Sequence, residues 1–166
     1  MEKQKYPSKF DRILDSVNSL LSWIAGSMIV VAMIIIFVDV IMRYIFNKPL
    51  IWVYYFSEYL LLYSTFLAAA YVLQVDRHIS VDILFASISK QKGKYVRLTA
   101  DILGLIYTLF LFWYSSEETY TAFTRSSRFS TPLENLEYPI MIIIPIGCLF
   151  LILQWGRRIR DRFRSL

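Results

Sequence analysis

Four long apolar stretches, separated by short polar segments, set the pattern of the chain. They cover about residues 17–46, 51–73, 98–123 and 136–155. A membrane-spanning helix needs about 20 mostly apolar residues to cross a hydrocarbon core roughly 30 Å thick. Each stretch meets that length, so the pattern predicts an all-α integral membrane protein with four transmembrane helices.

Two shorter segments are amphipathic. Residues 8–22 carry apolar side chains at helical spacing with charges opposite, which predicts an N-terminal lead-in lying at the membrane interface. Residues 79–89 predict a short interfacial helix between spans two and three; a hydrophobic loop or an early start of span three are the alternatives. Because the longest gap, residues 74–97, is too short for a soluble domain, residues 1–166 are interpreted as one membrane domain.

The ends of the spans carry recognisable helix breakers. Asn47 is a natural helix terminator, and Pro49 biases the residue before it out of the helical region, so span one is expected to end here. Pro145 removes one backbone hydrogen bond and is expected to bend span four. The apolar run of span one outlasts the 7 to 15 residues of a signal-peptide core, so we interpret it as a retained helix.

Composition and charge agree with a membrane protein and orient it. The chain of 166 residues is 57% hydrophobic and 19% charged, against 45–50% apolar residues in a typical soluble domain. Four spans place both termini on one side, which then holds fourteen of the eighteen Lys and Arg residues. The positive-inside rule predicts that this side is cytoplasmic. The basic tail 157–166 is interpreted as a stop-transfer signal and a contact for anionic lipids, rather than a nucleic-acid site.

Few residues could support catalysis or bind a metal. The chain has one histidine, His78, and one cysteine, Cys148, which lies inside span four. No HExxH, CxxC or GxSxG motif and no glycine-rich phosphate loop occurs. The predicted topology also places His78 on the opposite side of the membrane from the acids of spans one and two. We therefore expect no enzyme, no metal site and no cofactor.

Three ionisable residues lie inside the first two spans. A charge at the centre of a span costs about 2.5–3.5 kcal/mol on insertion scales, so such residues usually face protein and find partners. Asp39 and Arg43 are four residues apart with the acid first, the favourable order for a helical pair. Glu58 lies at a similar depth, so Arg43 could bridge both acids as a structural or subunit-interface clamp. An ion or proton relay, or an anionic-substrate contact by Arg43, is the alternative. Asp101 is interpreted as a helix-end acid.

An ordered set of residues resembles one family of membrane subunits. The chain resembles the small, Q-type membrane subunit of tripartite ATP-independent periplasmic (TRAP) transporters. The resemblance rests on Arg43, Tyr44, Phe46, Asn47, Pro49, Leu50, Trp52, Glu58, His78, Ile79, Ser80, Val81 and Asp82. It implies a bacterial inner-membrane complex with a large multi-span subunit, which holds the substrate and sodium sites and moves as an elevator. It also implies a periplasmic binding protein that delivers organic acids.

The resemblance implies a non-catalytic scaffold that braces the large subunit and helps dock the binding protein. Carried over to this chain, the recurrent polar positions are Arg43, Glu58 and the cytoplasmic motif residues His78 and Asp82. Spans one and two are expected to contact the large subunit. The residues expected to contact the binding protein are charged and outward-facing, namely Lys48, Arg125, Arg128, Glu134 and Glu137. Two rival hypotheses are a stand-alone four-helix ion or proton channel and a membrane enzyme or redox subunit with a bound cofactor.

Overall fold

The chain folds entirely into helices over the residues that the structure describes. This computed structural model describes residues 9–75, 90–125 and 138–163. Its helices are α1 (Lys9–Phe46), α2 (Ile51–Val75), α4 (Lys90–Arg125), α5 (Tyr138–Met141) and α6 (Ile143–Phe163). Helices α1, α2 and α4, together with the α5–α6 pair, are long and apolar enough to cross a membrane. These four candidate spans confirm the predicted all-α class.

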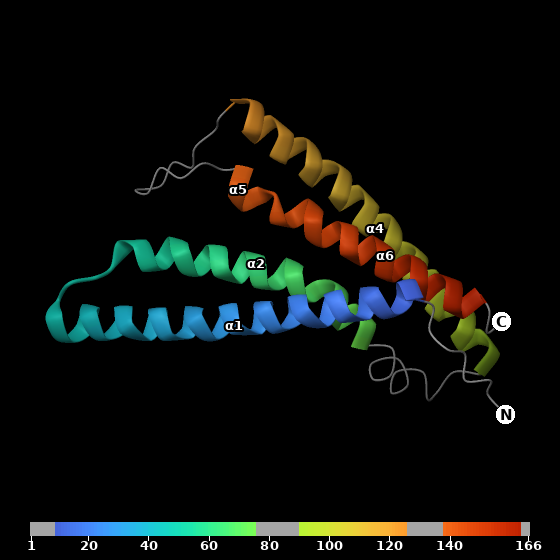
Figure 1. Cartoon of the computed structure of the whole chain (residues 1–166), viewed down its shortest axis with the longest axis horizontal. Coiled ribbons are helices and arrows are strands. Elements are labelled where there is room, and N and C mark those ends of the chain that lie inside the picture. The colour runs from blue at the N-terminus through green and yellow to red at the C-terminus, as the bar shows by residue number, and fades with distance from the viewer. Residues whose placement is uncertain (1–8, 76–89, 126–137, 164–166) are drawn as a thin grey trace.

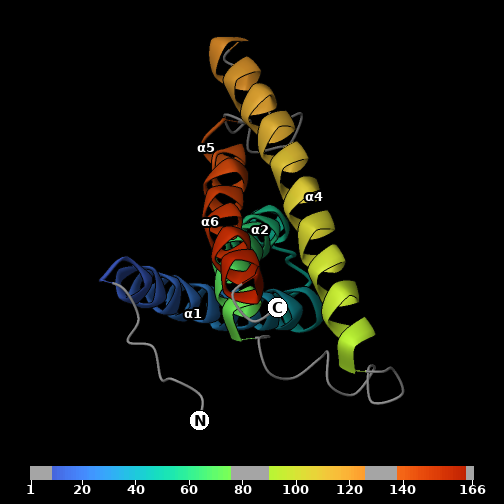
Figure 2. The same cartoon turned by 90° about the vertical axis from the view of Figure 1, so that its right-hand side faces the viewer.

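The helices form two hairpins that meet along α2 and α6. Helix α1 packs against α2, α4 packs against α6, and α2 packs against α6 (Figure 1). The hairpins converge where α1 begins and α6 ends, which we call the terminal end. Toward the other end, where residues 47–50 join α1 to α2, the hairpins spread apart (Figures 1 and 2). This second end is called the hairpin end.

The predicted amphipathic lead-in is not a separate element. Helix α1 runs unbroken from Lys9 to Phe46, so the lead-in forms the first turns of the first candidate span. Leu14 and Asn18, on these turns, are buried within the bundle. Of the apolar face of this segment, Leu14 packs within the bundle, whereas Ile13 and Leu20 are exposed, so only part of the face is covered by the chain itself. The second predicted interfacial helix, residues 79–89, lies outside the described residues.

The turn between α1 and α2 ends the first helix as the sequence predicts. Asn47 has a φ of 51°, in the left-handed region that asparagine tolerates better than most residues. The N–H of Lys48 donates to the carbonyl of Met42 at 3.0 Å, which folds the chain back over the last turn of α1. Helix α2 then begins at Ile51, two residues after Pro49.

The proline of the fourth span disturbs its helix one turn earlier in the chain. Pro145 has no N–H to donate to the carbonyl of Met141, its i−4 partner in a regular helix. The helical assignment is interrupted at Ile142, between α5 and α6. This interruption separates one short turn of helix from the long helix α6, and the predicted bend of span four stays a prediction.

Small residues allow the helices to approach closely. A Cβ atom on Gly147 of α6 would lie 2.7 Å from the backbone oxygen of Phe66 in α2, so the two helix backbones nearly touch there. Several of the most buried apolar side chains are alanines, including Ala25, Ala32 and Ala70. Helices in membranes associate through such close packing, because lipid supplies no hydrophobic driving force between them. Residues of this size thus set the spacing of the bundle that carries the charged groups.

Candidate functional site

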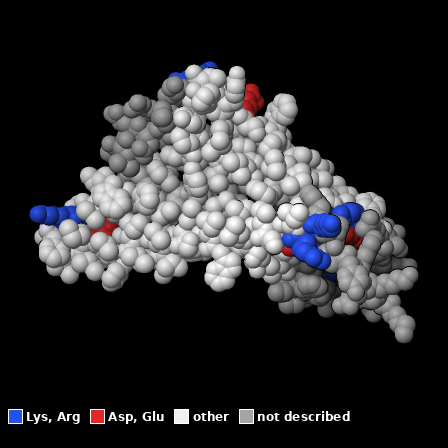
Figure 3. All heavy atoms as spheres, in the orientation of Figure 1, with Lys and Arg blue, Asp and Glu red and all other residues white. Residues whose placement is uncertain are grey.

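The last turns of α6 carry arginines that contact all three other long helices. Arg157 makes two hydrogen bonds to Asp15 of α1, through Nη1 to Oδ1 and through Nη2 to Oδ2 at 3.1 Å. Its Nε also lies 3.5 Å from Oδ1 of Asp11. Two parallel hydrogen bonds between a guanidinium and a carboxylate fix both direction and distance. This pair therefore links the first hairpin to the second. Figure 3 shows basic and acidic side chains gathered where α1 begins and α6 ends.

A second arginine strengthens the same link. Arg160 Nη2 donates to Asp11 at 3.0 Å to Oδ1 and 3.2 Å to Oδ2. Asp11 lies in the first turn of α1, and Arg160 lies in the last turn of α6. An acid near a helix start and a base near a helix end each interact favourably with the local helix dipole. The ion pair therefore agrees with the polarity of both helices.

The remaining two arginines connect α6 to α4 and α2. Arg158 Nε lies 3.2 Å from Oδ1 of the buried Asp101 in α4, and Arg162 pairs with the other oxygen of the same carboxylate. Arg158 Nη1 also donates to the carbonyl of Leu73 at 3.4 Å, one of the last four carbonyls of α2. Arg158 itself is buried and stacks near the ring of Trp155, 5.6 Å from its centroid. The Arg158 side chain thus connects α6 to both α4 and α2.

A layer of buried amides lies beside these ion pairs. Asn18 of α1 donates through Nδ2 to Oε1 of Gln74 in α2 at 3.1 Å. Gln154 of α6, one turn before Arg158, is among the most completely buried large side chains described. Amide hydrogen bonds between membrane helices contribute on the order of 0.6–2 kcal/mol each. The terminal end is consequently held by polar contacts more than by a large apolar core.

This cluster gives the basic tail partners that the sequence interpretation does not include. Four of its arginines, Arg157, Arg158, Arg160 and Arg162, pair with acids of α1 and α4. The stop-transfer and lipid-contact roles of the tail stay predictions. Asp101, expected as a helix-end acid, lies about three turns inside α4 and is buried between two of these arginines. Charges inside a membrane usually need partners. Applied to the acids near the N-terminus and the arginines near the C-terminus, this rule could have predicted the cluster from the sequence.

At the hairpin end, Asp39 is the centre of a smaller polar contact. Its Oδ2 accepts a hydrogen bond from Arg43 Nη2 at 2.7 Å, the predicted pair four residues apart. Its Oδ1 accepts one from the backbone N–H of Leu50, also at 2.7 Å. Leu50 directly precedes α2, so the carboxylate lies at the positive end of that helix dipole. Asp39 therefore joins the end of α1 to the start of α2; we call this contact the Asp39 clasp.

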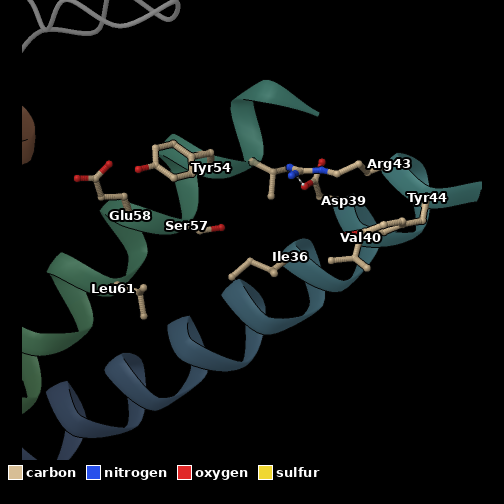
Figure 4. A pocket seen from close by; sticks show the side chains of 10 residues that line it. Ile36, Asp39, Val40, Arg43, Tyr44, Tyr54, Ser57, Glu58 and Leu61 are labelled. Atoms are coloured by element: carbon tan, nitrogen blue, oxygen red, sulfur yellow. Dashed lines mark hydrogen bonds and ion pairs between the residues drawn. The ribbon is translucent and has the colours of Figure 1, made fainter. Parts of the chain in front are cut away.

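Glu58 does not take part in the clasp. Its carboxylate points away from Arg43 and from α1 (Figure 4), and it makes no ion pair among the described residues. The predicted bridge from Arg43 to both acids is therefore absent. The reason is rotational, because Glu58 follows Ser57 by one residue, about 100° around α2, and Ser57 is the side chain that faces α1. Similar depth in the membrane did not place the two residues on facing sides.

A groove lies between α1 and α2 beside the clasp. Its volume is about 610 Å³, and most of its lining is apolar. Ser57 opens into it from α2 and is only 6% exposed, yet its hydroxyl has no hydrogen-bond partner among the described atoms. Other residues that line the groove include Ile36, Val40, Arg43, Tyr54 and Leu61. The groove therefore combines apolar walls with the guanidinium of Arg43, the carboxylates of Asp39 and Glu58 and the buried hydroxyl of Ser57 (Figure 4).

The other residues singled out in the sequence fall into two groups. Lys48 and Arg125 are exposed, the first in the α1–α2 turn and the second at the end of α4. The rest, His78, Asp82, Arg128, Glu134 and Glu137, lie outside the described residues. Within the described ranges no group of three or more His, Cys, Asp or Glu side chains is placed to hold a metal ion.

The clasp predicts different effects for two substitutions of the same residue. Asp39→Asn keeps an oxygen that can accept from the Leu50 N–H but removes the ion pair. Asp39→Ala removes both acceptors, so its free energy of unfolding in detergent should fall by about 1–2 kcal/mol more than that of Asp39→Asn. Reversible unfolding followed by circular dichroism measures the difference. Equal losses in the two variants would show that the bond to Leu50 contributes nothing.

Comparison with known families gives an independent result. A family model described as "Tripartite ATP-independent periplasmic transporters, DctQ component" matches residues 32–165. No curated protein matches the chain at a significant level. The matched region contains the Asp39 clasp, α2, α4 and the arginines of α6, and the family is described as a component of transporters. The chain therefore belongs to the family of small, DctQ-type components of TRAP transporters, as a multi-pass membrane protein.

Proposed function

We propose that this chain is a non-catalytic scaffold that braces the large membrane subunit of its transporter and helps to dock the periplasmic binding protein. The observation that carries the proposal is the pairing of intramembrane charges with one another. Asp39 is occupied by Arg43 and Leu50, and Asp101 by two arginines. Paired charges of this kind stabilise one arrangement of the helices, which is what a scaffold requires.

The same geometry argues against a stand-alone channel. That hypothesis needs Asp39, Arg43 and Glu58 to line one aqueous path. Asp39 and Arg43 instead neutralise each other beside the α1–α2 turn, and Glu58, which lines the same groove, points its carboxylate away from both. A proton relay requires groups that exchange protons in sequence, and these three are not arranged in a chain. The scaffold is therefore the better-supported function.

The proposed setting is the bacterial inner membrane, with the terminal end in the cytoplasm. The support is the charge distribution, because fourteen of the eighteen Lys and Arg residues lie on the side of the two termini. Orientation in this sense places the Asp39 clasp, Lys48 and Arg125 on the periplasmic side. The proposed cargo is an organic acid moved with a coupling ion, and both would be bound by the large subunit.

Glu58 is the proposed contact of α2 with the large subunit. It is an exposed acid about two turns into a candidate span, without an ion pair among the described residues. A carboxylate at such a position is stabilised by a basic group, and we expect a neighbouring subunit to supply one. The exposed apolar side chains of α1 and α2, such as Phe37, Val38 and Leu61, provide surface for the same contact.

Affinity capture in mild detergent tests the scaffold role. The tagged wild-type chain should retain a large polytopic protein, and Glu58→Gln should lower the recovered amount several-fold, because a carboxylate that pairs across subunits is lost. Glu118→Gln, which changes an exposed acid on α4, is the matched control and should behave as wild type. Recovery of the chain alone, under conditions that preserve other membrane complexes, would contradict the scaffold. Equal recovery for the two variants would contradict only the assignment of Glu58.

Charge reversal tests the docking role. Arg125→Glu combined with Arg128→Glu should reduce transport several-fold when the binding protein is limiting, with less effect when it is in excess, because rim charges act mainly on association rate. The effect should weaken as salt is raised. Arg12→Glu, an exposed base near the start of α1, is the control. Transport that is unchanged at every concentration of binding protein would remove these arginines from the docking surface.

A further inference from the structure

The short helix α5 is hydrogen-bonded to the middle of α2. The hydroxyl of Tyr63 donates to the carbonyl oxygen of Pro139 at 2.5 Å. A carbonyl oxygen has two lone pairs, so it can accept this bond in addition to a helical one. The ion pairs of Arg157 and Arg160 join the two hairpins at the terminal end. The bond of Tyr63 joins them instead at the beginning of the fourth candidate span.

A second contact joins the same turn to α4. The ring of Tyr138, the first residue of α5, meets the ring of Phe123 edge-on, with ring centroids 5.2 Å apart and an interplanar angle of 88°. This is a favoured geometry for an aromatic pair. Phe123 lies in the last turn of α4. The two rings therefore close the base of the connection between α4 and α5.

This connection carries most of the residues proposed to dock the binding protein. Arg125 ends α4, and Glu137 directly precedes Tyr138 in the sequence. Because Pro139 follows Tyr138 and accepts the bond from Tyr63, both ends of the connection are held on α2. The place of the docking residues relative to the first hairpin thus depends on one hydroxyl of α2.

Helix α5 depends on such contacts because it is not a continuous part of α6. The helical assignment is interrupted at Ile142, one turn before Pro145. A turn of four residues is too short to be a stable helix by itself. Packing on α4 and the bond to α2 therefore fix its position, and the hydrogen bond is the more directional of the two contacts.

We propose that Tyr63 is a positioning residue for docking, because its bond to Pro139 holds the base of the α4–α5 connection in the arrangement that the binding protein meets. This inference rests on the proposed docking role. A surface that already has its bound arrangement loses less conformational entropy on binding. Loss of the bond should therefore weaken capture of the binding protein and leave the transport step in the large subunit unchanged.

Transport by the complete reconstituted transporter, measured at rising concentrations of the binding protein, tests the proposal. Tyr63→Phe keeps the ring and removes the hydroxyl. It should raise the half-saturating concentration about two- to tenfold, the range that one hydrogen bond supplies, with the maximal rate unchanged. Tyr71→Phe is the matched control and should behave as wild type, because this hydroxyl of the same helix makes no hydrogen bond among the described residues.

The charge-reversal variant Arg125→Glu with Arg128→Glu separates two kinds of failure. If it raises the half-saturating concentration and Tyr63→Phe does not, the positioning role alone is wrong. If neither variant raises it, the docking role is wrong and the positioning role with it. A lower maximal rate in Tyr63→Phe, at an unchanged half-saturating concentration, would assign Tyr63 a structural role only.

A distance measurement tests the position of α5 without the binding protein. Spin labels on Tyr54→Cys and Ile142→Cys, at two exposed positions, report the distance between α2 and the end of α5 in the assembled transporter. The native Cys148 is fully buried, so it should not compete for the label. Tyr63→Phe should broaden the distance distribution, and Tyr71→Phe should not. Equal widths in the two variants would contradict the proposal whatever the transport assay shows.

Discussion

The ion pairs between the end of α6 and the start of α1 connect the two halves of this molecule. Away from the terminal end the hairpins diverge, and α2 and α6 form the main contact between them through small residues such as Gly147. Arg157 and Arg160 add contacts to Asp11 and Asp15, far apart in sequence and adjacent in space. Because Arg157 and Asp11 are largely buried, their pairing also offsets part of the cost of removing both charges from water.

The two ends of the bundle therefore differ in the way they are held. At the terminal end, polar contacts join α1, α2, α4 and α6 to one another. At the hairpin end, the Asp39 clasp joins the end of α1 to the start of α2. The hairpins converge at the terminal end and spread apart at the hairpin end, so faces of both hairpins are exposed. This shape agrees with the proposed scaffold role.

The four spans could be predicted from the sequence because length and hydropathy determine them directly. Asn47 and Pro145 also acted where their backbone chemistry predicts. The pair of Asp39 and Arg43 followed from helical spacing, but the role of Leu50 did not, because a backbone N–H leaves no mark in a sequence. The predicted bridge from Arg43 to Glu58 is absent because the depth of a residue along a helix does not specify the direction of its side chain around the helix axis. The arginine cluster was missed because it joins residues more than 140 positions apart, which no local pattern reports.

The central claim is that the contact between α6 and α1 stabilises the arrangement of the two hairpins. A double-mutant cycle on Arg157 and Asp15 measures it most directly, with Arg157→Ala, Asp15→Ala and the double variant compared by reversible unfolding in mixed micelles. The account predicts a coupling free energy of about 1–3 kcal/mol, because the two side chains share two hydrogen bonds in a partly buried site. Additive losses, within about 0.5 kcal/mol, would show that the two residues act independently and would contradict it.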